Sequence, residues 1–172
     1  GPGGVGKSSL GRALSGELGW QLIDLDLEFC AQVGMIGDFI AARGYLAYRA
    51  ENLALADRLT HSLKRHSIFV TASGFLTALP GTEDYLSARR IVSCGYGITL
   101  LPSLDLEVAP SVVVERQLGR GFGFERAGEE QKFRDRFAKY RDEGEALVVS
   151  LERPEKIADT VIRCLLGDVI VR

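Results

Sequence analysis

The first nine residues of the chain carry the clearest chemical signature. Gly1, Gly6, Lys7 and Ser8 occupy every fixed position of the pattern G-x-x-x-x-G-K-[ST], which is typical of loops that bind nucleotide phosphates. Glycines let backbone N–H groups turn inward around phosphate oxygens, and the following helix directs its positive end at the same anion. Lys7 is expected to reach the β- and γ-phosphates, and the Ser8 hydroxyl to bind Mg²⁺. The residues predicted to bind nucleotide in this loop are Gly3, Gly4, Val5, Gly6, Lys7, Ser8 and Ser9.

Two aspartates lie at the end of the next predicted strand. Because residues i and i+2 of a strand share a face, the carboxylates of Asp24 and Asp26 are expected to point together into the crevice beyond the strand ends. Open α/β folds bind their ligands in that crevice. Asp24 would face Mg²⁺ through water, and Asp26 would accept the proton of an acceptor hydroxyl. The alternative interpretation is that one of the two only caps the following helix.

Three arginines lie in segments that suit the recognition of anions. Arg49 and Arg136 lie on predicted helices, and a planar guanidinium can bind a carboxylate or phosphate through two parallel hydrogen bonds. Arg120 lies in the glycine-rich segment 119–124, where a mobile lid could bring a cation to a transferring phosphoryl group. The alternative interpretation of each is a solvated charge on a helix or in an ordinary surface loop.

These residues require a scaffold in which strands and helices alternate. Strands are predicted at residues 20–24, 68–71, 96–101 and 147–150, and helices at residues 7–18, 27–33, 36–43, 45–65, 82–89, 104–116, 125–141 and 154–166. Thr82 and Pro102-Ser103 are expected to cap the helices that follow them. Alternation of this kind predicts a three-layer α/β/α fold with a short lid and a central parallel sheet of about five strands. Phosphate-binding loops normally follow a buried strand, so the first strand is expected to be truncated from a single domain over residues 1–172.

The composition limits the classes of function. The chain has 172 residues, 46% of them hydrophobic, and a net charge of −2, which fits one domain and gives no broad attraction to nucleic acid. No apolar run is long enough to span a membrane. The three cysteines are widely spaced, so buried free thiols in a reducing, cytoplasmic compartment are expected, unless a targeting segment precedes Gly1. The chain is expected to be a monomer or part of a larger polypeptide, with no nucleic-acid or membrane partner.

Together these motifs resemble the shikimate kinase family, within the nucleoside-monophosphate-kinase group of P-loop proteins. The order of loop, Asp-x-Asp, aromatic-Arg helix, turn, lid and late arginine helix is similar over essentially the whole chain. The resemblance implies ATP- and Mg²⁺-dependent phosphorylation of the shikimate 3-hydroxyl, a step of aromatic amino-acid biosynthesis. It also implies a role for each matching residue. The carboxylate-bearing substrate would be bound by Asp26, Arg49, Arg136 and the turn Ala72-Ser73-Gly74, the adenine would lie between Arg116 and Pro154, and Arg120 would be the lid arginine.

Three positions depart from the pattern of that family. The family's turn is Gly-Gly-Gly, whereas Ala72-Ser73-Gly74 places two side chains where the backbone is expected to lie against the substrate ring. The family has Glu three residues after the helical arginine, where this chain has Asn52. The lid is short and reads Arg120-Gly121-Phe122 in place of Arg-Pro-Leu.

These departures leave two alternatives beside shikimate phosphorylation. The first is a related kinase that acts on another hydroxy acid, such as gluconate. The second is a domain that binds nucleotide or metabolite without turnover. The presence of Lys7, Ser8, Asp24 and Asp26 argues against this alternative, because a domain without turnover has little reason to keep all four. A GTPase is disfavoured because the chain lacks an Asn-Lys-x-Asp guanine motif, and a motor ATPase because the strand at residues 68–71 ends in Thr.

Overall fold

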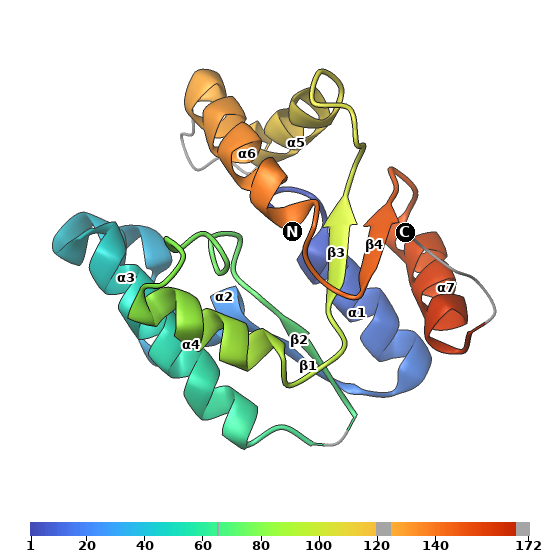
Figure 1. Ribbon diagram of the computed structural model, residues 1–172, viewed down its shortest axis with the longest axis horizontal. Coiled ribbons are helices and arrows are strands. Elements are labelled where there is room, and N and C mark those ends of the chain that lie inside the picture. Colours follow the sequence, from blue (N-terminus) through green and yellow to red (C-terminus); the bar gives the residue numbers. More distant parts are fainter. Residues whose placement is uncertain (65, 120–124, 168–172) are drawn as a thin grey trace.

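The computed structural model describes residues 1–64, 66–119 and 125–167. Helices and strands alternate along these residues, as expected for an α/β protein (Figure 1). The elements are α1 (Lys7–Leu18), β1 (Gln21–Asp24), α2 (Leu25–Gln32), α3 (Ile36–His61), β2 (Ser67–Val70), α4 (Glu83–Val92), β3 (Ile98–Leu101), α5 (Ala109–Leu118), α6 (Arg126–Tyr140), β4 (Ala146–Val149) and α7 (Pro154–Leu165).

The four strands form two parallel pairs. Strand β1 pairs with β2, so that Asp24 lies opposite Val70 at the carboxyl ends. Strand β3 pairs with β4, and Leu101 lies opposite Val149. Within the described residues no ladder of hydrogen bonds joins one pair to the other. The sheet expected from the sequence is therefore present as two parallel halves.

Helix α1 connects these halves by packing. An added Cβ at Gly11 would lie 2.7 Å from a methyl group of Val70, so this face of the helix approaches β2 closely. Leu10 and Leu14, on another face, belong to the same buried cluster as Leu100 of β3. Because these contacts are apolar and close, α1 is held in a fixed position between both strand pairs. The loop that begins at the first residue is thereby fixed at its helical end.

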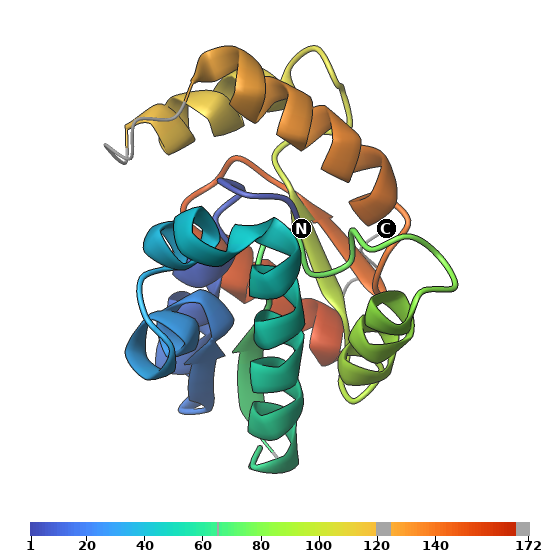
Figure 2. The ribbon, with the colours of Figure 1, turned by 90° about the vertical axis from the view of Figure 1, so that its left-hand side faces the viewer.

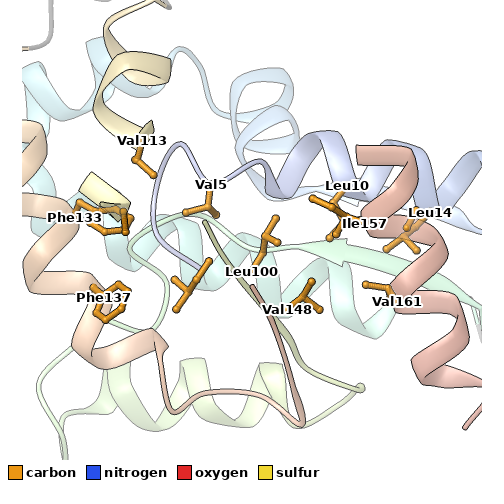
Figure 3. Packing of buried hydrophobic residues seen from close by; sticks show 13 residues of the cluster. Val5, Leu10, Leu14, Leu100, Val113, Phe133, Phe137, Val148, Ile157 and Val161 are labelled. Carbon is orange, nitrogen blue, oxygen red and sulfur yellow. The ribbon is translucent and has the colours of Figure 1, made fainter. Parts of the chain in front are cut away.

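The larger buried cluster also includes the side chain of a loop residue (Figure 3). Val5 is 3% exposed and lies near Leu100 of β3 and Val113 of α5. Phe133 and Phe137 of α6 lie nearby. Val5 therefore anchors the loop in the apolar core, while its main chain remains part of the loop. In Figures 1 and 2, α5 and α6 lie together beyond the arrowhead of β3, and the chain begins between this pair of helices and the rest of the molecule.

The start of α5 corrects one expectation. The sequence predicts a helix from residue 104 capped by Pro102-Ser103, but α5 begins at Ala109. The Ser103 hydroxyl accepts a hydrogen bond from the Asp105 N–H at 3.0 Å, and the Asp105 carboxylate accepts one from the Glu107 N–H at 2.8 Å. These local bonds turn the backbone before a helix can form. Pro110, whose φ suits a first helical turn, follows the true start.

Other boundaries agree with the expectations from the sequence. Thr82 caps α4, and its side chain accepts a hydrogen bond from the Tyr85 N–H at 3.3 Å. The two helices expected on either side of Gly44 are continuous in α3 except at Gly44 itself, whose φ of 83° is not helical. Glycine adopts this conformation without the steric cost of a Cβ.

Two expectations from composition have different outcomes. Cys30, Cys94 and Cys164 are free thiols, but Cys94 is exposed and the other two are half-buried, so the expectation of buried thiols is wrong. Among the described residues, no helix has both the length and the apolar character needed to cross a membrane.

Tyr140 joins the end of α6 to the turn after β2. Its side chain is 1% exposed, and its hydroxyl oxygen accepts a hydrogen bond from the Leu76 N–H at 3.3 Å. Burial raises the pKa of Tyr140 to about 12, whereas a tyrosine in the unfolded chain has a pKa of about 10. Between these two pKa values the folded protein keeps the Tyr140 proton, whereas the unfolded chain loses it. The stabilisation that comes from the buried, neutral Tyr140 hydroxyl is therefore complete below pH 10 and is lost as the pH rises toward 12.

We expect the Tyr140→Phe variant to lose less stability at alkaline pH than the wild type. Between pH 8 and pH 11, the free energy of unfolding should fall by about 1 kcal/mol more in the wild type than in the variant. The reason is that only the wild type has a hydroxyl at residue 140 that ionises on unfolding. Urea titrations of both proteins at the two pH values measure the difference. An equal fall in both would contradict the assignment to Tyr140.

Candidate active site

The phosphate-binding loop has the backbone geometry that its sequence predicts. Gly4 and Gly6 have φ angles of 75° and 102°, in the left-handed region that other residues rarely adopt. Helix α1 begins directly after Gly6, so its free N–H groups face the loop. The Lys7 ammonium bends back across the loop and donates a hydrogen bond to the Pro2 carbonyl at 2.8 Å. Ser8 and Ser9 follow on the first turn of α1, both half-buried.

Helix α5 lies close against this loop. A Cβ at Gly4 would lie 2.7 Å from a Val113 methyl carbon and 3.1 Å from the Val113 carbonyl oxygen. A Cβ at Gly3 would lie 2.9 Å from the side-chain nitrogen of Gln117. Gln117 is 9% exposed and its carbonyl oxygen has no hydrogen-bond partner in the described structure. Sequence analysis did not find this residue, because an isolated glutamine on a helix gives no motif.

We expect Gly4→Ala to destabilise the protein by about 1–3 kcal/mol, because it adds both backbone strain and a clash with Val113. Gly16→Ala is the matched control, since Gly16 lies exposed on α1 with no atom within 4 Å of the added Cβ. That control should stabilise the protein by up to about 1 kcal/mol through helix propensity. Urea unfolding measures both values. Equal effects of the two substitutions would show that the loop tolerates a side chain.

The two aspartates differ from the arrangement expected for them. The chain turns into helix α2 directly after Asp24, so Asp24 and Asp26 do not share the face of a strand. Asp24 is 5% exposed and caps α2, since its Oδ1 accepts a hydrogen bond from the Asp26 N–H at 3.2 Å. The expectation of a shared strand face is therefore wrong, and Asp24 caps the following helix. Asp26 is half-buried on the first turn of α2.

Asp26 contacts an aromatic side chain from α3. The Tyr48 hydroxyl forms a hydrogen bond with the Asp26 carboxylate, and Tyr48 itself is 8% exposed. Burial is the main cause that raises the pKa of Tyr48, followed by the negative charge of Asp26. Tyr48 is therefore a neutral hydrogen-bond donor at any physiological pH. The sequence pattern pointed to an aromatic residue here, but it did not assign a role to its hydroxyl.

The turn after β2 brings the predicted acceptor residues together. A cavity of about 10 Å³, enough for about one water molecule, is lined by side chains of α3 and by this turn. Arg136 of α6 donates a hydrogen bond from Nη1 to the Ser73 hydroxyl at 3.0 Å. Three of the predicted substrate residues line the cavity itself. Its lining is Tyr45, Tyr48, Arg49, Asn52, Leu53, Ala72, Gly74 and Phe75.

Gly74 is the one position of this turn that retains the glycine of the family pattern. A Cβ at Gly74 would lie 2.3 Å from the Tyr45 hydroxyl oxygen and 3.5 Å from Arg136 Nη2. Tyr45 lines the cavity and is 39% exposed. The absence of a side chain at Gly74 therefore leaves room for the Tyr45 hydroxyl beside the turn.

The acceptor turn lies beside the phosphate loop. A Cβ added at Gly3 would lie 3.6 Å from the Cβ and 3.7 Å from the Oγ of Ser73. The Ser73 hydroxyl also accepts the hydrogen bond from Arg136 of α6. The phosphate loop, the acceptor turn and α6 therefore meet at Ser73. Residues more than 60 positions apart in the sequence are thereby joined at the predicted site.

Arg49 has a partner that the sequence did not predict. Its Nε donates a hydrogen bond to Asp84 Oδ2 of α4 at 2.8 Å, and the side chains are 19% and 34% exposed. Asn52 occupies the position at which the family pattern has glutamate. It is 3% exposed, and its Nδ2 has no hydrogen-bond partner among the described residues.

The predicted adenine residues neither line the cavity beside the acceptor turn nor bond to Ser73 in the described structure. Arg116 is exposed on α5, and no hydrogen bond or ion pair of the described residues involves its side chain. Pro154 is half-buried at the first position of α7. Arg120, the predicted lid arginine, lies outside the described residues.

The comparisons with known proteins agree on one family. The family model for shikimate kinase matches residues 3–165. A shikimate kinase of Halorhodospira halophila is 36% identical over 93 residues, 54% of this chain and 51% of that protein. The pentafunctional AROM polypeptide of Eremothecium gossypii is 30% identical over 90 residues, 51% of this chain and 5% of that protein. These matches therefore span about half of the first relative and a small part of the second.

Solved structures resemble the whole fold at lower identity. Shikimate kinase from Acinetobacter baumannii in complex with shikimate has a TM-score of 0.76 at 21% identity, covering 99% of this chain and 92% of that one. Shikimate kinase from Bacteroides thetaiotaomicron has a TM-score of 0.72 at 18% identity, covering 95% and 93%. The glycine-rich loop, the helix that follows it and the parallel strands define a P-loop α/β protein. The family match is more specific, and the chain belongs to the shikimate kinase family.

Proposed function

We propose that this protein transfers the γ-phosphoryl group of ATP to the 3-hydroxyl of shikimate. The observation that carries the proposal is the position of the acceptor turn beside the phosphate loop. A Cβ added at Gly3 would lie 3.6 Å from the Ser73 Cβ, and the Ser73 hydroxyl accepts a hydrogen bond from Arg136 at 3.0 Å. Phosphoryl transfer depends mainly on holding donor and acceptor in line and on neutralising charge, so a shared boundary between the two sites suits it.

The acceptor side fits a hydroxylated carboxylate. Arg49 and Arg136 supply two guanidinium groups on either side of the turn, and such groups bind carboxylates through charge-assisted hydrogen bonds. Asp26 is the proposed carboxylate that orients the reacting hydroxyl and accepts its proton. The Tyr48 hydroxyl restrains that carboxylate by its hydrogen bond. The relative from Acinetobacter baumannii is described in complex with shikimate, which supports this choice of acceptor.

The donor side fits Mg·ATP. Lys7 lies across the phosphate loop. The glycines of this loop leave the backbone N–H groups open to phosphate oxygens. Ser8 and Asp24 are the oxygen donors that would hold Mg²⁺, and they fit because Mg²⁺ takes one or two protein ligands and completes its shell with phosphate and water. A cluster of three metal-binding side chains, absent from the described residues, is therefore not required. When bound, Mg²⁺ would neutralise charge on the phosphates. Arg116 and Pro154 remain the proposed adenine contacts, and Arg120 the proposed lid cation.

A second candidate acceptor is favoured by the changed turn. Ala72 is 4% exposed and Ser73 presents a hydroxyl to Arg136, so both side chains take up space near the cavity. A smaller or differently hydroxylated acid, such as gluconate, would be the acceptor if these side chains exclude the shikimate ring.

A coupled assay of ADP release tests these possibilities on the purified protein with Mg·ATP. Shikimate, gluconate and no acceptor are compared at equal concentration, and nucleotide binding is measured separately. Release that depends on shikimate supports the proposal, and faster release with gluconate supports the second acceptor. ATP binding with no acceptor-dependent release would overturn both in favour of a domain without turnover.

A further inference from the structure

We infer that Asp84 of α4 is the residue that positions Arg49 for the acceptor carboxylate. This inference rests on the proposed function. Arg49 Nε donates to Asp84 Oδ2 at 2.8 Å, across 35 positions of sequence. Bonding at Nε leaves both Nη groups of the planar fork for a second anion. Arg49 lines the cavity beside the acceptor turn, so the second anion would lie there.

The residue that would otherwise orient Arg49 has no charge. Asn52 lies three positions after Arg49 on α3, which places both side chains on one face of the helix. Its side chain is buried and neutral, and its Nδ2 has no hydrogen-bond partner among the described residues, so it offers Arg49 no negative charge. The carboxylate that restrains Arg49 therefore comes from another helix. The ion pair between Arg49 and Asp84 thereby connects α4 to the acceptor site.

Asp84 is itself held in place by the start of α4. The helix is capped by Thr82, and Asp84 lies in its first turn, where a negative charge is favourable. Its side chain is 34% exposed, against 19% for Arg49. A carboxylate fixed at a helix terminus is a rigid partner, whereas an arginine alone loses much rotamer freedom when it is ordered.

Two effects of Asp84 on acceptor binding have opposite signs. Its negative charge weakens the attraction of the site for an anion, so neutralising it would strengthen binding if charge dominated. Its hydrogen bond fixes the guanidinium, so removing it would weaken binding if orientation dominated. Because a third of the Asp84 side chain is exposed, solvent and salt screen the charge effect. The geometry therefore points to orientation as the larger effect.

The test compares Asp84→Asn with Glu83→Gln. Glu83 is exposed in the same first turn of α4 and has no hydrogen bond or ion pair among the described residues. Both variants lose one negative charge at the same helix terminus, but only the first loses the partner of Arg49. We expect Asp84→Asn to raise the KM for shikimate by about tenfold, with kcat and the KM for ATP within about threefold of the wild type. Glu83→Gln should leave all three constants within about twofold.

Two further readouts separate positioning from general stability. Asp84→Glu, which retains the carboxylate, should recover most of the lost affinity for shikimate. The preference for shikimate over its methyl ester should shrink in Asp84→Asn, because an ordered Arg49 recognises the charged acid. An unchanged or lower KM in Asp84→Asn, or an equal change in Glu83→Gln, would overturn the inference. Absence of turnover in the wild type would instead defeat the proposed function, so the two failures are distinguishable.

Discussion

Replacing Lys7 by alanine is expected to lower kcat/KM for acceptor phosphorylation by about 10³-fold or more. A preorganised cation at the transferring phosphoryl group contributes an effect of this size, because charge builds there as the reaction proceeds. The fold should survive, since Val5 is buried in the apolar core, the glycines fix the loop, and Lys7 is itself only half-buried, with a hydrogen bond to the Pro2 carbonyl. Loss of that bond costs about 1 kcal/mol of stability.

Lys156→Ala is the matched control for this experiment. Lys156 lies exposed on α7, where it is 3.9 Å from Glu152 in a surface ion pair of little energetic value. Steady-state ADP release gives the kinetic constants, and urea unfolding confirms that both variants are folded. Activity of the Lys7 variant within tenfold of the wild type would contradict the role given to Lys7.

The donor loop could be predicted from the sequence because its functional residues are consecutive. Gly4 and Gly6 adopt the left-handed φ angles that their residue type permits, and the helix after Lys7 follows from apolar spacing. Parallel strands and alternating helices were also predictable, since each depends on local periodicity. Local signals are sufficient where one short segment both forms the structure and performs the chemistry.

The acceptor site depends on contacts that no local pattern encodes. The pairing of Arg49 with Asp84 joins α3 to α4, and the contact of Tyr45 with Gly74 joins α3 to the turn after β2. Asp24 was correctly placed at the strand end, but its capping geometry separated it from Asp26. Sequence patterns thus predicted candidate residues for the site, whereas tertiary packing determines which of them are paired.

The chemical step itself is tested most directly at Asp26. Asp26→Asn is expected to lower kcat by about 10²–10⁴-fold, the usual contribution of a general base. The amide is nearly isosteric with the carboxylate, but it cannot accept the proton of the acceptor hydroxyl. The N–H of residue 26 still donates to Asp24 Oδ1, so the cap of α2 is retained. The Tyr48 hydroxyl can still donate to the amide oxygen, so the variant should unfold at a urea concentration close to that of the wild type.

Glu28→Gln supplies the matched control, because Glu28 lies in the same first turn of α2 and its carboxylate binds only Gln32 at 2.7 Å among the described residues. Both substitutions remove one negative charge near the start of α2, so the charge change alone affects them equally. A large loss of kcat in Asp26→Asn together with near-normal turnover in Glu28→Gln would assign the loss to the carboxylate facing the acceptor. If Asp26→Asn instead raised only the KM for shikimate, Asp26 would bind the acceptor without taking its proton. Full activity in Asp26→Asn would remove this residue from the mechanism and would require another proton acceptor at the site.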